Sequence, residues 1–516
     1  MLIPGVLYLN SSTIYGFTKN KVPIRKFKSY LYGYDNKIIY VSTKKKTSAH
    51  NLYAIVREQD INNTKKYILI SIIGKVGDYQ VEKKFAKYMY KLNRKPVRLQ
   101  QLPNIDITPD RTIITQLNCY SIDPSDCTDI DDLVSYNIIN KNICRIGIHI
   151  ADVSSYIAEG SDLDNIIRNR GETIYYDNYK DNMLPDIMAD NICSLIENVE
   201  KRAYSIFFDI DINTYQILKQ YHTKSIVINK NRLTYEEAEK IIISNNNKYT
   251  DLIEMYNIGE KLYAKDNYDI HKMIETFMIL ANSYVGNFIK DKQNAIIRVQ
   301  DAPLPDTMSE NNLGYVIKDN VYNVISMFSR ERAYYKFVCS DISLQNNDNL
   351  HYDLGIKNYT HFTSPIRRYA DILVHRTLYN VTKNDPNICN HLNDVHKKIS
   401  YLCRDLDRLN FVYTIQNLDT IQKAYVIHIN DNEIKVYIKD ANIDGICKLF
   451  SKKISHLINY KSDCEKIIID DNIFLKLADE IKIRLIVSTK APTIKKKLLI
   501  QLIEPNIKHI TYKKNL

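Results

Sequence analysis

Acidic side chains crowd into one short stretch of the chain, CYSIDPSDCTDIDDLVSY, and could bind a cation. Five of them lie within ten residues: Asp123, Asp126, Asp129, Asp131 and Asp132. No Lys or Arg occurs between positions 112 and 140, so no sequence neighbour neutralises the carboxylates. Because like charges at such spacing repel, these carboxylates are solvated, partly protonated or bound to a cation.

The ligand chemistry indicates which cation would fit. Carboxylate oxygens suit Mg²⁺, or Mn²⁺ as the alternative ion, and both metals also bind substrate phosphate. A calcium loop of the EF-hand type needs a Gly that this segment lacks. Asp-Pro and Ser-Asp favour a turn, and the following LVSYNI favours a strand. The sequence therefore predicts a loop that feeds a strand and holds the acidic side chains.

A pair of arginines, Arg367 and Arg368, forms a second candidate site. Ser364 is a favourable N-cap and Pro365 a favourable first helical residue, so a helix is expected to begin here. Cations are unfavourable at the positive end of a helix, whereas a phosphate would be bound by arginine and by free N–H groups. The alternative is an ordinary ion pair between Arg367 and Asp371, one turn on.

Aromatic residues could hold bases, but 40 tyrosines make any single one a weak candidate. Tyr175 and Tyr176 lie in GETIYYDNY. Tyr235 follows Thr234, which with Glu237 predicts a capping box at a helix start.

The positive charge is concentrated in the first part of the chain. The formal net charge is +11; residues 1–105 contain 20 Lys and Arg against 5 Asp and Glu, and the remaining 411 residues contain 51 against 55. This excess indicates either a solvated surface or attraction to a polyanion.

Three domains are predicted in a multidomain α+β chain. Residues 1–105 alternate short strands with lysines and aromatics, as in an OB-like barrel that binds single strands, although such a barrel could also serve only as a scaffold. Residues 106–411 mix strands and helices and contain the candidate sites. Residues 412–516 return to strands and predict a second small barrel, with a basic stretch from Thr489 to Lys497.

Other sequence features limit the protein class. No apolar run reaches about 18 residues, so no membrane span is expected. The N-terminus is predicted to be a strand rather than a signal peptide. The nine cysteines contain no C-x-x-C pair, which makes a zinc site unexpected and suits a reducing, cytoplasmic environment.

Five ordered blocks resemble the ribonuclease II (RNB) family of 3′-to-5′ exoribonucleases, across residues of about 115–411. The blocks are SIDPSDCTDIDD, IHIADVSSYIAEGSDLD, MLPDIMADNICSL, RLTYEEAEK and HYDLGIKNYTHFTSPIRRYADILVHR. The resemblance implies a mixed α/β RNB-type catalytic core flanked by small OB-like β-barrels, of cold-shock type before it and ribosomal-protein type after it.

The resemblance also implies residue roles. Asp123 and Asp132, helped by Asp129, match the family's magnesium ligands, and Asp131 matches the carboxylate most needed for cleavage. The remaining matches bind RNA: Arg367 with its neighbour Arg368 at the phosphate, and Tyr175 and Tyr235 at the terminal bases. Cys403 stands where the family carries Glu or Gln, a departure that affects RNA release rather than metal chemistry.

The expected activity is two-metal hydrolysis of single-stranded RNA to nucleoside 5′-monophosphates. Two alternatives are an RNA-binding protein with an inactive nuclease core and a subunit of an RNA-decay complex, with other RNA-decay proteins as partners.

Overall fold

The computed structural model describes residues 1–505 with gaps, and all structural statements refer to the described residues. The gaps are residues 35, 62–63, 98, 100–109, 177–178, 264–266, 293, 303–330, 339–348, 379–384, 417–419, 431–432, 450–459, 463–465 and 470–471. None of the helices in this described part has the length and the apolar run that a bilayer crossing requires.

The described chain has the mixed α/β fold that the sequence predicts, and it divides into two compact units. One unit combines Met1–Asn93 with Lys398–Leu516, and the other combines Arg94–Ala302 with Glu331–Lys397. The stretches predicted as two flanking barrels thus fall in one unit, and the candidate sites fall in the other.

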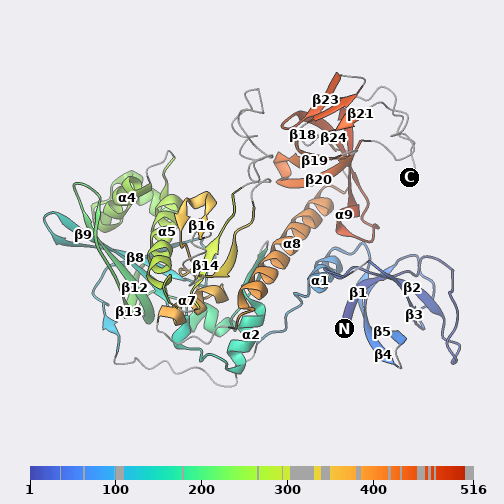
Figure 1. The fold of residues 1–516 in the computed structure, drawn as a ribbon, viewed down its shortest axis with the longest axis horizontal. Helices are drawn as coiled ribbons and strands as arrows, with labels where there is room; N and C mark the ends of the chain where they lie inside the picture. The colour runs from blue at the N-terminus through green and yellow to red at the C-terminus, as the bar shows by residue number, and fades with distance from the viewer. Residues whose placement is uncertain are drawn as a thin grey trace. The chain divides into compact units, whose positions relative to one another are not determined.

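A five-stranded sheet opens the first unit (Figure 1). Its order is β3-β2-β1-β4-β5, and the helix α1 follows it. The bounds are β1 (Leu2–Leu7), β2 (Ile24–Ser29), β3 (Ile38–Ser42), β4 (Leu52–Ile61), β5 (Thr64–Lys75) and α1 (Tyr79–Met89). Every second residue of β2 and β3 is buried, which follows from the two-residue period of a strand with one face on a core.

The C-terminal strands form a closed barrel in the order β18-β19-β20-β25-β24, which confirms the second predicted barrel. The bounds are β18 (Thr420–Ile429), β19 (Glu433–Ile438), β20 (Ile443–Lys448), β24 (Glu480–Val487) and β25 (Leu498–Glu504). A three-stranded sheet and a short helix accompany it: β21 (Tyr460–Ser462), β22 (Lys466–Ile469), β23 (Asn472–Lys476) and α9 (Ile494–Lys497).

One lysine of the stretch from Thr489 to Lys497 does not contribute to a basic surface. Lys497 is fully buried, and its Nζ lies 2.7 Å from Oε1 of Glu82 on α1. Gly77 N–H and Tyr53 OH donate to the same carboxylate oxygen, at 2.9 and 3.2 Å. This ammonium is therefore a structural ion-pair partner that joins α1 to α9.

The second unit is built on a six-stranded sheet in the order β12-β9-β8-β7-β13-β6. The long strand β13 pairs with β12 through its first part and with β7 through its last residues, so the sheet folds back on itself. The bounds are β6 (Thr112–Ile113), β7 (Cys119–Asp123), β8 (Asp132–Asn140), β9 (Ile143–Ala151), β12 (Glu200–Asp211) and β13 (Ile217–Thr234).

Helices and short strands surround this sheet, and Figure 1 shows α4 and α5 beside its strands. The helices are α2 (Asp162–Arg170), α3 (Tyr235–Ser244), α4 (Thr250–Tyr263), α5 (Ile270–Ile289) and α7 (Tyr369–Leu378), with a π-helical turn at Met188–Ile192. The long helix α8 (Ile388–Thr414) begins in this unit, and its residues from Lys398 onward belong to the first unit. The short strands are β10 (Ile174–Tyr176), β11 (Tyr179–Asp181), β14 (Ile296–Val299), β15 (Tyr334–Phe337), β16 (Leu350–His351) and β17 (Ile356–Lys357).

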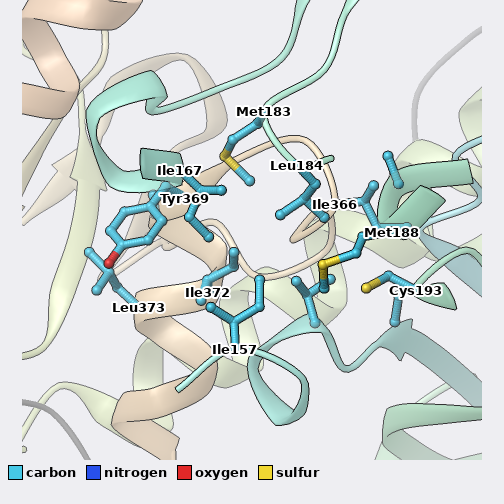
Figure 2. Close-up of a cluster of buried hydrophobic side chains, with 14 of the residues drawn as sticks. Ile157, Ile167, Met183, Leu184, Met188, Cys193, Ile366, Tyr369, Ile372 and Leu373 are labelled. Atoms are coloured by element: carbon cyan, nitrogen blue, oxygen red, sulfur yellow. The ribbon is translucent and has the colours of Figure 1, made fainter. Parts of the chain in front are cut away.

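An apolar core holds α7 and the segment just before it (Figure 2). Ile366, Ile372 and Leu373 are at most 3% exposed and belong to the same cluster as Met188 and Cys193. Burying an aliphatic side chain of this size stabilises the fold by about 1.5–3 kcal/mol. The burial of these side chains therefore fixes the backbone next to Arg367.

Gly286 on α5 allows a close backbone approach that Gly286→Ala would prevent. An added Cβ would lie 1.8 Å from the carbonyl oxygen of Asn358, a backbone atom that cannot turn aside. We expect a loss of about 1–3 kcal/mol in the free energy of unfolding, measured by urea denaturation. The control Ser283→Ala, on the same helix, should change it by about 0.5 kcal/mol or less. Equal effects of the two variants would contradict this packing.

Candidate active site

The acidic loop of residues 124–131 connects two neighbouring strands, as predicted. Asp123 ends β7, and Asp132 begins β8. Ser194 holds the loop, because its Oγ accepts the Ile130 N–H at 3.0 Å and donates to the Thr128 carbonyl at 2.8 Å. The carboxylates thus project from a fixed backbone.

Asp131 joins the acidic loop to the arginine segment. The Ile366 N–H donates to Asp131 Oδ1 at 2.8 Å, and Arg367 Nε lies 3.3 Å from Asp131 Oδ2. Asp131 is buried, whereas the Arg367 side chain is 45% exposed. Burial, partly offset by Arg367, raises the pKa of Asp131 well above its usual value. The two candidate sites predicted separately are one site.

The helix predicted to begin at Ser364 and Pro365 begins later, at Tyr369. The preceding segment runs alongside residues 171–173: Tyr369 N–H donates to Gly171 O at 2.8 Å, and Thr173 N–H donates to Arg367 O at 2.9 Å. One turn forms at the predicted place, since the Arg368 N–H donates to Ser364 O at 3.0 Å, but the bonds to residues 171–173 separate this turn from α7. The anion expected at this turn is present as a side chain, because Asp131 accepts the Ile366 N–H.

The ion pair with Asp371 is formed by Arg368 and not by Arg367. Arg368 Nε and Nη2 donate to the two carboxylate oxygens of Asp371 at 2.9 and 2.8 Å. Burial disfavours the charged form of Arg368, but the attraction of the Asp371 carboxylate is stronger and raises the pKa of the guanidinium. Arg367 also donates, through Nη2, to Ser364 Oγ at 2.8 Å. Arg367 is thus the more exposed of the two arginines at the site, and RNA binding by Arg368 stays a prediction.

A hairpin holds Asp129 from the other side. Tyr175 on β10 stands directly opposite Lys180 on β11. The Tyr175 hydroxyl donates to Asp129 Oδ2, and Lys180 Nζ donates to Asp129 Oδ1 at 3.0 Å. Lys180 also donates to Thr128 Oγ1 and Asp190 Oδ1, both at 2.7 Å. Lys180 was not predicted as a site residue from the sequence, although its position opposite Tyr175 in a YYDNYK hairpin could have indicated that role.

Asp123 and Asp132 make up the part of the cluster that most needs a cation. Burial, with a contribution from neighbouring carboxylates, raises the pKa of Asp123 to about 6 and that of Asp132 to about 7. Asp123 Oδ2 is buried with no hydrogen-bond partner among the described residues, and an orphaned acceptor of this kind is costly. The donor set therefore fits a hard divalent ion. In the described chain, however, no three His, Cys, Asp or Glu side chains already converge as a complete metal site.

Tyr235 lies beside Asp123, at the first position of α3. The predicted capping box is confirmed: Glu237 N–H donates to Thr234 Oγ1 at 3.1 Å, and Thr234 N–H donates to Glu237 Oε2 at 2.8 Å. Thr234 in turn pairs with Asp123 across β13 and β7. The Tyr235 ring stacks on His271, with centroids 3.8 Å apart, so one face of the ring is covered.

A cavity of about 940 Å³ connects these groups within the second unit. It contains every predicted site residue, and its lining also includes side chains that sequence reasoning did not select. The predicted residues are Asp123, Asp129, Asp131, Asp132, Tyr175, Tyr235, Arg367 and Arg368; the added ones include Lys180, Glu275, Asn282, His351, Asp353, Tyr359 and His361. Cys403 is half-buried on α8.

A family model described as RNB domain matches residues 111–265 and 251–384. The chain belongs to the RNB family. The match covers the sheet, the acidic loop and the arginine segment, so the elements that build the cavity are those that define the RNB domain.

Known proteins similar to this chain include nucleases and a protein described as a pseudonuclease. The human protein named exosome complex exonuclease RRP44 is 27% identical over 474 residues, which cover 78% of this chain and 49% of that protein. The chain spans about half the length of the curated relatives it matches. RNase R of Mycoplasma genitalium, solved with ribose-methylated single-stranded RNA, has a TM-score of 0.74 at 18% identity and covers 98% of this chain and 90% of its own. Yeast Ssd1, described as a pseudonuclease, has a TM-score of 0.68 at 20% identity and covers 87% and 65%.

Without divalent ions, the protein should lose stability as the pH rises from about 4 to 8. The pKa values of Asp123 and Asp132, about 6 and 7, exceed the usual 3.8, so between these values the folded protein binds more protons than the unfolded chain. Mg²⁺ should therefore raise the melting temperature more at pH 8 than at pH 5. A double variant, Asp123→Asn with Asp132→Asn, should lose most of this difference. An equal Mg²⁺ effect at both pH values would contradict the assignment.

Proposed function

We propose that this chain is a 3′-to-5′ exoribonuclease that hydrolyses single-stranded RNA to nucleoside 5′-monophosphates. The observation that carries the proposal is that Asp131 contacts the Ile366 N–H and the Arg367 guanidinium. This contact supports Arg367 as the group that would bind phosphate beside the acidic loop. The similar human protein is named an exonuclease, and the similar RNase R structure contains single-stranded RNA. Both similarities support the proposal.

The roles proposed for the chain's own residues follow from their contacts. Asp123 and Asp132, with Asp129 nearby, would hold Mg²⁺, or Mn²⁺ in its place. When bound, such an ion supplies positive charge at the phosphate and makes a coordinated water more acidic. Asp131 would accept a hydrogen bond from the attacking water and orient it. Arg367 would bind a phosphate oxygen and stabilise the negative charge that grows there during cleavage.

The aromatic rings would hold RNA without reading its sequence. Tyr175 and Tyr235 both line the cavity, and every base has a face on which a ring can stack. Tyr175 is 44% exposed although its hydroxyl is fixed by Asp129, so its ring can meet a base without moving. The 2′-hydroxyl would let the site prefer RNA to DNA.

One specific observation favours the second candidate, an RNA-binding protein with an inactive core: the similarity to Ssd1, a pseudonuclease. The four carboxylates and Arg367 are all present and meet in one cavity, which favours the enzyme. Membership of an RNA-decay complex is suggested by the name of the human relative. We propose a cytoplasmic location because the dispersed cysteines suit a reducing compartment.

Digestion of end-labelled RNA distinguishes the exoribonuclease from the RNA-binding protein with an inactive core. We expect the full chain with Mg²⁺ to release labelled mononucleotide at once from 3′-labelled RNA, and only at the end of digestion from 5′-labelled RNA. Chelation of the ion should stop both. Tight RNA binding without release would instead establish the inactive core.

Asp131→Asn should reduce cleavage by about 10²–10⁴-fold and leave RNA affinity within about twofold. The asparagine oxygen can still accept the Ile366 N–H, so the connection between loop and arginine segment persists while the carboxylate charge is lost. Single-turnover cleavage and fluorescence anisotropy measure the two effects. Asp291→Asn, an exposed change in the same unit, serves as the control. Retained cleavage in Asp131→Asn would refute the assigned role.

The first sheet should contribute to RNA binding through its lysines. On β2, Lys26 lies over Tyr8 and Lys28 over Tyr30, with Nζ 5.3 and 5.6 Å from the ring centroids. Lys26→Gln with Lys28→Gln should lower the slope of log affinity against log salt by about 1.4, since each single-strand phosphate contact contributes about 0.7. The pair Lys141→Gln and Lys219→Gln, exposed on the other unit, is the charge-matched control. Equal slopes in the two double variants would show that this sheet does not bind the RNA through these lysines.

A further inference from the structure

Lys180 is a fully coordinated cation inside the acidic cluster. Its ammonium group has three N–H donors, and three acceptors surround it: Asp129 Oδ1, Thr128 Oγ1 and Asp190 Oδ1. The backbone fixes its position, because β11 pairs with β10 and Lys180 stands opposite Tyr175. The lysine therefore fills a defined position in the site.

Asp129 has both carboxylate oxygens occupied by this hairpin. Oδ1 accepts from Lys180 and Oδ2 accepts from the Tyr175 hydroxyl. Asp123 differs, since its Oδ2 is buried without a hydrogen-bond partner among the described residues. A metal ion therefore finds an unpaired oxygen on Asp123, whereas at Asp129 it would meet the charge of the Lys180 ammonium.

The ion pairs around the site agree with this difference between Asp123 and Asp129. The four carboxylates are Asp123, Asp129, Asp131 and Asp132. Lys180 offsets one of these negative charges and Arg367 another. Lys180 is shared between Asp129 and Asp190, and Asp371 forms a separate ion pair with Arg368. Asp123 and Asp132 have no ion-pair partner among the described residues, so they are the two carboxylates left for a divalent ion.

We propose that Lys180 takes the place of a second metal ion at Asp129, so that the site holds one divalent ion, on Asp123 and Asp132. This inference rests on the proposed function and replaces the two-ion arrangement expected from sequence. Lys180 is a positioning residue: it neutralises Asp129 and holds the acidic loop through Thr128, and it acts on cleavage only through them.

Counting bound Mn²⁺ on the full chain tests the proposal. Free Mn²⁺ is measured by electron paramagnetic resonance during titration, and the Asp123→Asn, Asp132→Asn double variant supplies the background from other sites. We expect one ion per chain above background for the unmodified protein and for Lys180→Arg, which keeps the charge. Lys180→Met should bind two, because Asp129 and Asp190 lose their cation. Lys141→Met, the same change on an exposed turn, should leave the count at one.

Each other outcome overturns the inference. Two ions on the unmodified chain would show that Lys180 does not replace a metal, and none would show that Asp123 and Asp132 do not hold one. One ion on Lys180→Met, with an unchanged circular dichroism spectrum, would show that the lysine does not exclude the second. Should Lys180→Met not fold, Lys180→Gln is expected to bind two ions and decides in the same way.

Failure of this inference is distinguishable from failure of the proposed function. If the unmodified chain binds one Mn²⁺ but releases no nucleotide from RNA, the proposed function fails and the ion count stands. If it cleaves RNA and binds two ions in the site, only the role of Lys180 fails.

Discussion

The bond between the Asp131 carboxylate and the Ile366 N–H connects the two halves of the site. Two segments 235 residues apart in sequence meet there, the loop before β8 and the segment before the helix α7. Because Asp131 is buried, leaving its carboxylate without a partner would destabilise the fold by more than the hydrogen bond stabilises it. The loop and the arginine segment are therefore fixed together or not at all. This bond and the burial of Ile366 in the apolar core hold Arg367 at the acidic loop.

The acidic cluster is tolerated because its members have different partners. A hairpin lysine and tyrosine hold Asp129, and a backbone amide and an arginine hold Asp131. Asp123 and Asp132 are the pair whose burial the protein's own cations offset least, as their raised pKa values indicate. We therefore propose that a divalent ion would relieve the repulsion between these two carboxylates.

Much of this was predictable from local patterns. The loop before β8, the capping box at Thr234 and the strands of the first sheet and of the C-terminal barrel all depend on residues close in sequence. The family resemblance then selected carboxylates and an arginine that line one cavity in the structure. The start of α7 was mispredicted, because Ser364 and Pro365 are good helix-starting residues whose preference is overridden by pairing with residues 171–173. Lys180, Lys497 and the Arg368–Asp371 pair were assigned wrongly or not at all, since the partners of a charge depend on folding and not on spacing.

The central claim is that the last phosphodiester of an RNA lies between these carboxylates and Arg367. Replacing each non-bridging oxygen of that linkage by sulfur, one stereoisomer at a time, tests it directly, because sulfur binds Mg²⁺ poorly and Mn²⁺ or Cd²⁺ well. The account predicts that one isomer resists cleavage in Mg²⁺ and is cleaved again in Mn²⁺ or Cd²⁺. Cleavage of both isomers in Mg²⁺ at the rate of unmodified RNA would contradict it.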